Sequence, residues 1–143
     1  MVYLSAGNIS LRIDDNVVAI TPSGIKYTAL QPDHIAIVDL DGNPIDAPYN
    51  PSSETPMHTH LLRKLPDVNA IFHTHSSYAI TFAMLGKPIP VVNLELFVVG
   101  APIPVAPWAC PGTEAPGEAA SNLFVAHPDL KVVLLRNHGL VAI

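Results

Sequence analysis

The feature that most constrains the fold is a series of short apolar runs, rich in Val and Ile, that are separated by turn signals. The runs that predict strands cover residues 9–13, 16–20, 34–40, 68–75, 89–99 and 102–108, and residues 130–143 predict two strands around a turn at 137–139. Asp14-Asp15 predicts a hairpin between the first two runs, and Asp41-Gly42 predicts a turn after the third. Apolar runs of this kind, bounded by turns, are typical of strands in a buried sheet.

Three segments between these runs have the pattern of helices. The first follows residues 51–54, with Ser52 or Ser53 expected to cap it, Glu54 in its first turn and Pro66 at its end. Residues 76–85 and 112–127 predict the other two helices. Strands that alternate with helices in this way predict a layered α/β domain with a mixed sheet.

Composition and charge exclude several functions. The 143 residues suffice for one domain, and the net charge of −5, with seven scattered Lys and Arg residues, argues against a nucleic-acid partner. The single cysteine, Cys110, excludes a disulfide framework and fits a reducing cytoplasm. The start of the chain lacks the pattern of a signal peptide, and no apolar run approaches the ~18 residues that a membrane span needs. We therefore expect a cytoplasmic protein without a membrane partner.

The sequence His-Thr-His occurs twice, at 58–60 and at 73–75. On a helix, residues i and i+2 lie about 200° apart around the axis, so the first pair cannot meet one ion. On a strand, residues i and i+2 share a face and lie about 7 Å apart, which suits two ligands of one ion. We therefore expect His73 and His75 to bind a metal. Of the first pair, we expect one histidine to be buried and hydrogen-bonded and the other to face solvent.

Two further residues are candidates to complete this metal site. His138 lies in an Asn-His-Gly turn after a predicted strand, where a rigid loop exposes the imidazole. Glu54 lies at the predicted start of a helix. Three histidines and one carboxylate make a tetrahedral zinc site, and a displaceable carboxylate opens a coordination position for substrate.

Three small polar turns precede the candidate ligands in the chain and offer hydroxyl or backbone N–H groups. They cover residues 5–10, 21–27 and 51–54. Such turns bind phosphate well, above all at a helix N-terminus, but each one alone is also an ordinary turn or cap. Their value as evidence depends on their meeting near the metal.

The chain resembles the class II aldolase/adducin family, the group of L-fuculose-phosphate aldolase and L-ribulose-phosphate 4-epimerase. The segments that carry the resemblance are SAGNISLR, ITPSGIKY, IAIVDLDGNPI, PSSETPMH, PDVNAIFHTHSSYA, IPVAPW with the following GT, and VVLLRNHGLVAI. The resemblance implies a three-layer α/β/α sandwich around a mixed, mostly antiparallel sheet, and a C4 homotetramer. It implies one zinc ion per subunit, held by Glu54, His73, His75 and His138. It also implies a substrate-phosphate site formed by Ser5, Gly7, Asn8, Ser23, Gly24, Ser52 and Ser53.

The resemblance further implies a zinc-dependent aldolase acting on a small phosphorylated ketose. In that reaction zinc acts as a Lewis acid, Glu54 moves a proton, and the bond breaks through a metal-stabilised enediolate. The products are dihydroxyacetone phosphate and an aldehyde. The alternatives are an epimerase, dehydratase or decarboxylase with the same metal site, or a non-catalytic adducin-like domain.

The chain departs from the family pattern in two places. Residues 1–143 read as a single domain truncated at both ends, without the usual helix before it and without the tail that supplies a tyrosine for proton transfer in a neighbouring subunit. Residues 91–100 occupy the place of a catalytic Tyr or Asp of the family and contain neither. Glu95 is the ionisable group there, so it is a candidate acid–base residue; the alternative is an exposed or interface glutamate.

Overall fold

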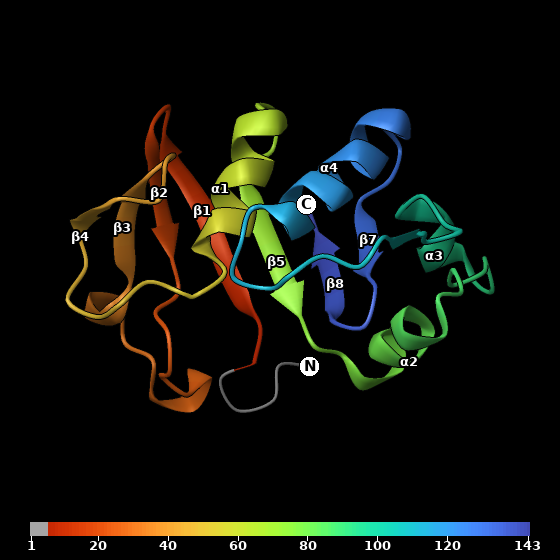
Figure 1. Ribbon diagram of the computed structural model, residues 1–143, viewed down its shortest axis with the longest axis horizontal. Coiled ribbons are helices and arrows are strands. Elements are labelled where there is room, and N and C mark those ends of the chain that lie inside the picture. Colours follow the sequence, from red (N-terminus) through yellow and green to blue (C-terminus); the bar gives the residue numbers. More distant parts are fainter. Residues whose placement is uncertain (1–5) are drawn as a thin grey trace.

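The computed structural model describes residues 6–143, which form an eight-stranded sheet with helices on both faces (Figure 1). The strands are β1 (Asn8–Asp14), β2 (Val17–Ile20), β3 (Ala36–Asp39), β4 (Pro44–Asp46), β5 (Ala70–Thr74), β6 (Val105–Ala106), β7 (Val132–Leu135) and β8 (Gly139–Ala142). The helices are α1 (Thr55–Lys64), α2 (Ser77–Leu85), α3 (Leu94–Val98) and α4 (Ala115–Ala126), with short 3₁₀ turns at Tyr27–Ala29 and Pro32–His34. None of the helices in this part of the chain is long and apolar enough to cross a membrane.

The strand order in the sheet is β4-β3-β2-β1-β5-β8-β7-β6. The pairing of β6 with β7 is parallel, and the other pairings are antiparallel. The expected mixed, mostly antiparallel sheet is therefore confirmed. At its centre, β1 pairs Asn8 with His73 of β5, and β5 in turn pairs His73 with Val141 of β8.

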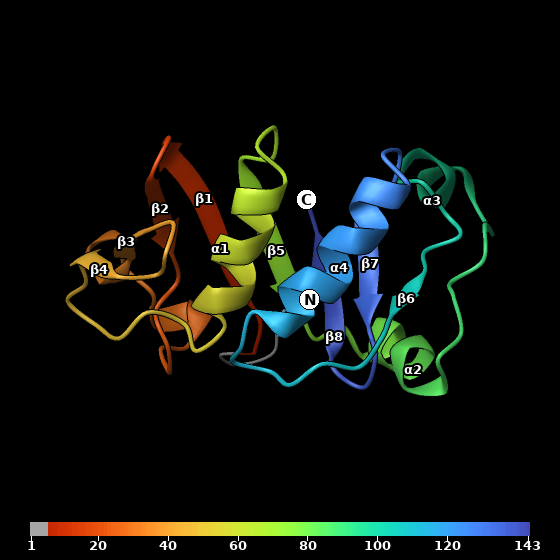
Figure 2. The same cartoon turned by 45° about the horizontal axis from the view of Figure 1, so that its top comes forward.

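Helices α1 and α4 lie side by side on one face of the sheet in both views (Figures 1 and 2). Under them lies the main core, to which α1 contributes the fully buried Met57 and Leu61. Successive strand residues point to opposite faces, so Val133 and Leu135 of β7 enter this core. Leu134, between them, belongs to a second and smaller core on the opposite face.

Helix α2 covers that opposite face over β7 and β8, through Ala79 and Ala83. Over β1 and β5 the same face stays open, and Leu11 and Phe72 are 51% and 46% exposed there. The fold thus has the α/β/α order that we expected, but the third layer covers only part of the sheet within the described residues.

The start of α1 differs from the sequence prediction. The helix begins at Thr55 with Glu54 as its N-cap residue, and no side chain caps it. The hydroxyl of Ser52 instead accepts a hydrogen bond from the backbone N–H of Glu54, at 3.2 Å. The prediction that Ser52 or Ser53 caps this helix is therefore wrong, because the serine turn is completed one residue before the helix starts.

The strand predicted over residues 89–99 is also wrong for most of its length. Residues 94–98 form the short helix α3, and within residues 89–99 the structure has one isolated β-bridge, between Ile89 and Ile103. The side-chain oxygen of Asn93 accepts a hydrogen bond from the backbone N–H of Leu96, at 3.0 Å. This local N-cap favours a helical turn over the strand preference of the valines that surround it. The short edge strand β4 was not predicted.

The contact between α1 and α4 depends on a glycine. A Cβ atom at Gly117 of α4 would lie 2.7 Å from the carbonyl oxygen of Met57 and 3.1 Å from the Cβ of His60. Both of these neighbours belong to α1, and backbone atoms cannot move aside cheaply. The two helices therefore approach each other as closely as they do because residue 117 has no side chain.

We predict that Gly117→Ala destabilises the protein, although alanine gains about 1 kcal/mol of helix propensity. Overpacking costs about 1–3 kcal/mol, so we expect a net loss of about 1 kcal/mol in the free energy of unfolding by urea denaturation. Glu118→Ala, at the exposed neighbouring position, is the control and should change that free energy by less than about 0.5 kcal/mol. A Gly117→Ala variant more stable than wild type would show that the helices can separate at little cost.

Candidate metal centre

Four side chains from distant parts of the chain converge at one end of the central strands. They are Glu54 at the N-cap of α1, His73 in β5, His75 directly after β5, and His138 in the turn between β7 and β8. Each offers one ligand atom, and these four atoms all lie within 4.8 Å of one another. The structure thus brings together the four residues that the sequence singled out as ligands.

The turn that carries His138 has a backbone that only certain residues adopt. Asn137 has a φ of 56°, in the left-handed region where asparagine is enriched. A Cβ atom at Gly139 would lie 2.5 Å from the carbonyl oxygen of Thr74 and 3.0 Å from Cε1 of His73. The Asn-His-Gly sequence therefore allows the turn to pack against the end of β5, where the other histidines lie.

Hydrogen bonding orients His73 as a metal ligand. Its Nδ1 lies 2.9 Å from the carbonyl oxygen of Leu140, which can only accept, so Nδ1 carries the hydrogen. In the neutral ring, Nε2 then presents its lone pair. This Nε2 lies 2.9 Å from Nε2 of His75 and 3.0 Å from Oε2 of Glu54. A histidine ligand whose other nitrogen donates to a carbonyl is the usual arrangement in metal sites.

The donor set fits a divalent cation. Oε1 of Glu54 lies 3.1 Å from Nε2 of His138, yet it is buried and accepts no hydrogen bond. A buried carboxylate oxygen without a partner is costly, and a cation at this point satisfies it. In a tetrahedral site with bonds of about 2.1 Å, neighbouring ligand atoms lie about 3.4 Å apart, a spacing within the range seen here.

The surroundings of the four residues favour the protonation states that bind metal. Burial raises the pKa of Glu54, but the nearby rings of His138 and His73 and the amide of Asn8 outweigh burial and hold the pKa well below its usual range. Burial, together with the neighbouring His73 and His138, lowers the pKa of His75. The site thus favours an ionised carboxylate and a neutral imidazole at these positions.

Behind the metal centre lies a buried chain of hydrogen bonds that the sequence did not predict. The hydroxyl of Ser10 lies 2.7 Å from Nδ1 of His58, and Nε2 of His58 lies 2.5 Å from Oδ1 of Asn8. The amide nitrogen of Asn8 donates to Oε2 of Glu54 at 3.0 Å. His58 is fully buried, and burial lowers its pKa to about 3. No sequence pattern indicates the bond between Asn8 and Glu54, which are 46 positions apart.

The first His-Thr-His pair supplies no ligand to this cluster. His58 is the buried, hydrogen-bonded member that we expected. His60, expected to face solvent, is instead buried at 9% exposure. That prediction is wrong because α4 packs over this face of α1, and Nδ1 of His60 lies 3.2 Å from the carboxylate of Glu114, just before α4.

The three polar turns meet beside the four converging residues. A hollow of about 400 Å³ contains Glu54, His75 and His138, and residues of all three turns line it. Those residues are Gly7, Asn8, Ser23, Gly24, Ser52 and Ser53, with Pro111 and Gly112 on a further side. Ser5 lies outside the described residues. Glu95 is exposed on α3 and does not line this hollow.

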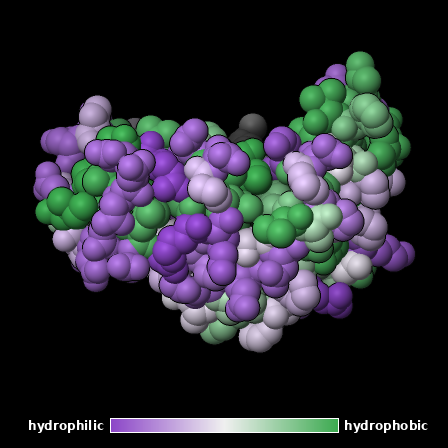
Figure 3. Space-filling view, turned by 90° about the horizontal axis from the view of Figure 1, so that it is seen from above, coloured by the Kyte–Doolittle hydropathy of each residue, from purple (hydrophilic) through white to green (hydrophobic). Residues whose placement is uncertain are grey.

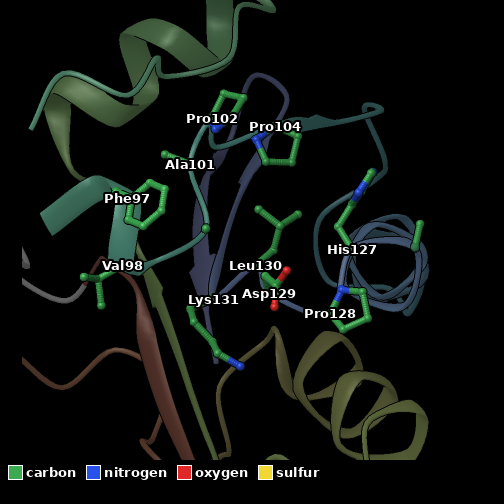
Figure 4. Close-up of a pocket in the computed structure, with 12 residues that line it drawn as sticks. Phe97, Val98, Ala101, Pro102, Pro104, His127, Pro128, Asp129, Leu130 and Lys131 are labelled. Atoms are coloured by element: carbon green, nitrogen blue, oxygen red, sulfur yellow. The ribbon is translucent and has the colours of Figure 1, made fainter. Parts of the chain in front are cut away.

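A larger hollow, of about 960 Å³, lies elsewhere, between α3 and the end of α4 (Figure 4). Its walls are mostly apolar, with Phe97, Pro104 and Leu130 among them, and Lys131 and Asp129 lie at one side. None of the four converging ligand residues lines it. Binding sites combine a hollow with convergent polar groups, so we place the candidate site in the smaller hollow.

Comparison with known proteins assigns the chain to a family. The family model described as "Class II Aldolase and Adducin N-terminal domain" matches residues 1–143. The chain belongs to this family, as its sequence motifs indicated.

Relatives with named activities support the same assignment. The chain is 41% identical over 139 residues to a 5-deoxy-D-ribulose 1-phosphate aldolase of Bacillus thuringiensis serovar kurstaki, covering 96% of this chain and 64% of that protein. It is 35% identical to an L-fuculose phosphate aldolase of Escherichia coli O6:H1, over 96% of this chain and 62% of that one. A solved structure of an L-fuculose 1-phosphate aldolase superposes with a TM-score of 0.86 at 34% identity, over 96% of this chain and 64% of that chain. The chain thus spans less than two thirds of the length of these relatives.

We predict that the chain holds one divalent ion through the four converging residues. After zinc loading and exhaustive dialysis, the wild type should retain about one ion per chain, and His73→Ala should retain none, because it removes a ligand oriented by Leu140. His60→Ala is the matched control and should keep the ion. A folded wild type that holds no ion by elemental analysis would contradict the assignment.

We also predict that the metal-free protein loses stability below neutral pH because of His58. Its pKa is lower in the folded state than its ordinary value of 6.5, so the unfolded chain takes up a proton first as the pH falls. Stability is therefore lost as the pH falls from 6.5 toward 3, by about 2 kcal/mol between pH 7 and pH 5 from this residue alone.

Urea denaturation in the presence of a chelator measures this loss. His58→Gln should have a smaller difference between pH 7 and pH 5 than the wild type. His75, whose pKa is also lowered, retains its own contribution in that variant. An equal pH dependence in the two proteins would show that His58 titrates normally in the folded state.

Proposed function

We propose that this chain carries the active site of a metal-dependent aldolase that cleaves a small phosphorylated ketose to dihydroxyacetone phosphate and an aldehyde. The observation that carries the proposal is that one hollow is lined both by residues of the four-residue ligand cluster and by three turns of a kind that binds phosphate. Relatives that share this domain are named 5-deoxy-D-ribulose 1-phosphate aldolase, 5-methylthioribulose-1-phosphate/5-deoxyribulose-1-phosphate aldolase and L-fuculose 1-phosphate aldolase. We therefore propose a ketose 1-phosphate as the substrate.

We propose zinc as the metal, one ion per chain, held by Glu54, His73, His75 and His138. Three imidazoles and one carboxylate are a common donor set for zinc, and the arrangement gives one oxygen that substrate can displace. A divalent cation held there supplies Lewis-acid stabilisation of negative charge that develops on the substrate oxygens.

Glu54 is the proposed general base. Its pKa is held well below the usual range, and its carboxylate lines the hollow. A carboxylate released from a metal regains basicity, so Glu54 can take a proton from the substrate and later return it. The side-chain amide of Asn8 donates a hydrogen bond to Oε2 of Glu54 at 3.0 Å and so helps to fix where the carboxylate lies.

The polar turns are the proposed phosphate site. Ser23, Gly24, Ser52 and Ser53 line the hollow with hydroxyl and backbone N–H groups, beside the N-terminus of α1. A helix N-terminus favours an anion, and a phosphate held there orients the sugar toward Glu54. We also assign Gly7, Asn8 and Ser5 to this site.

An epimerase, dehydratase or decarboxylase is the second candidate, because each uses the same kind of metal site. No observation favours these reactions over cleavage, and the named relatives are aldolases. A non-catalytic adducin-like domain has no physical need for an ionised carboxylate buried among three histidines.

We propose that the chains associate, as a homotetramer. Figure 3 shows apolar side chains gathered on the projecting end of the molecule that carries α3. Val92, Leu94, Phe97 and Val98 are each more than 60% exposed in this region. Burial of such side chains against another chain supports association. Because Glu95 lies on α3 and outside the hollow, an acid–base role for it belongs to the site of another chain.

A cytoplasmic location and a single domain over residues 1–143 stay predictions.

The proposal predicts release of dihydroxyacetone phosphate from 5-deoxyribulose 1-phosphate or fuculose 1-phosphate. An assay in which a second enzyme reduces the dihydroxyacetone phosphate detects this release. The rate of release should vanish with a chelator and return with zinc. Glu54→Gln should lower kcat by at least about 100-fold, because it removes a general base. Glu118→Gln, on the exposed face of α4, is the control. A product with one inverted stereocentre and no cleavage would replace the aldolase by the epimerase.

A further inference from the structure

We propose that His58 is a positioning residue: it fixes the side-chain amide of Asn8 so that this amide holds the carboxylate of Glu54 in place for metal and substrate. The inference deepens the proposed function, since it rests on Glu54 being a ligand and a base. It also gives a role to the member of the first His-Thr-His pair that binds no metal.

The contacts form one continuous path from β1 through α1 to the metal centre. Ser10 meets Nδ1 of His58 at 2.7 Å, Nε2 of His58 meets Oδ1 of Asn8 at 2.5 Å, and Nδ2 of Asn8 meets Oε2 of Glu54 at 3.0 Å. All four residues are buried, and His58 has no exposed surface. Water therefore does not reach the ring of His58, which makes its two hydrogen bonds stronger than exposed ones.

The chemistry of each group fixes the direction of every hydrogen bond. The amide nitrogen of Asn8 donates to Oε2 of Glu54, a carboxylate oxygen that accepts, so the nitrogen end of the Asn8 amide faces Glu54. The oxygen end of Asn8 then faces His58 and only accepts, so Nε2 of His58 carries the ring hydrogen. The neutral ring has one hydrogen, so Nδ1 accepts from the hydroxyl of Ser10. The path thus has one consistent arrangement, with every donor facing an acceptor.

His58 and Glu54 together hold the Asn8 amide with its nitrogen toward the metal centre. If the amide turned over, its oxygen would lie against the carboxylate of Glu54, and its nitrogen would face the N–H of His58. Both contacts would be repulsive in a buried place. With His58 in place, one hydrogen of Asn8 holds Glu54, and the second remains for the hollow that Asn8 lines.

The helix places Glu54 and His58 one turn apart on the same side of α1. The backbone N–H of His58 donates to the carbonyl of Glu54 at 3.2 Å, so the two residues are fixed relative to each other before any side chain contributes. Asn8, from β1, closes the path between the two side chains. A histidine in this place is thus tied to Glu54 twice, through the helix and through Asn8.

The first test measures which nitrogen of His58 carries the hydrogen, in the metal-free wild type, by long-range ¹H–¹⁵N NMR of the ring. The expected result is the Nε2–H tautomer at pH 7. Ser10→Ala, which removes the donor to Nδ1, should reduce the preference for this tautomer. A ring with its hydrogen on Nδ1 would overturn the proposal, whatever the activity of the protein.

The second test is a double-mutant cycle on zinc affinity, measured by chelator competition. His58→Leu should weaken zinc binding about 10-fold or more, as loss of a supporting partner of a metal ligand does, and His58→Gln, which keeps a donor toward Asn8, should recover part of it. In an Asn8→Ala background, His58→Leu should cause no further loss, because its effect passes through Asn8. His60→Gln, in the same helix, is the matched control and should leave affinity unchanged.

Equal losses from His58→Leu with and without Asn8 would overturn the proposal, because they would mark a general effect on the fold. If His58→Leu does not fold, Ser10→Ala and His58→Gln carry the same cycle. A wild type that binds no zinc would overturn the proposed function, and the tautomer alone would then decide the hydrogen-bond path.

Discussion

The antiparallel pairing of β1, β5 and β8 is the constraint on which the rest of the structure depends. Pairing Asn8 with His73 and His73 with Val141 sets three segments in register, although they lie more than sixty residues apart in the chain. A slip of one residue would turn His73 to the opposite face of the sheet, away from α1. The same register that buries Ile71 under the helices therefore aims the first ligand at the metal centre.

Helix α1 supplies the carboxylate that faces the histidines of the sheet. Met57 and Leu61 anchor the helix in the core, and its N-terminus then holds Glu54 over the ends of the strands. An ionised carboxylate is favoured at a helix N-terminus, and Glu54 lies there with its side chain directed at His73 and His138. The chemistry of the site and the packing of the core are thus consequences of one helix lying on one sheet.

The sequence predicted those features that local periodicity determines. Strand spacing separated His73 and His75 from His58 and His60, and turn chemistry singled out His138. It failed where a contact between distant segments decides the outcome. Burial of His60 requires α4 to lie on α1, and the bond between Asn8 and Glu54 joins residues that share no local pattern. At residues 94–98 a single cap, Asn93, prevailed over the strand preference of its neighbours.

The spacing of Glu54 and His58 has a consequence for how such a site can change. Residues four apart keep the same side of a helix only while the turn between them is intact, and one inserted residue would rotate one against the other by about 100°. The carboxylate and the imidazole that supports it therefore keep their relative positions only as long as this helical turn is unchanged. The partners of that turn, Ser10 and Asn8, lie two positions apart in β1 and therefore on the same face of the strand. One turn of helix and three residues of strand thus contain all the side chains of this hydrogen-bond path.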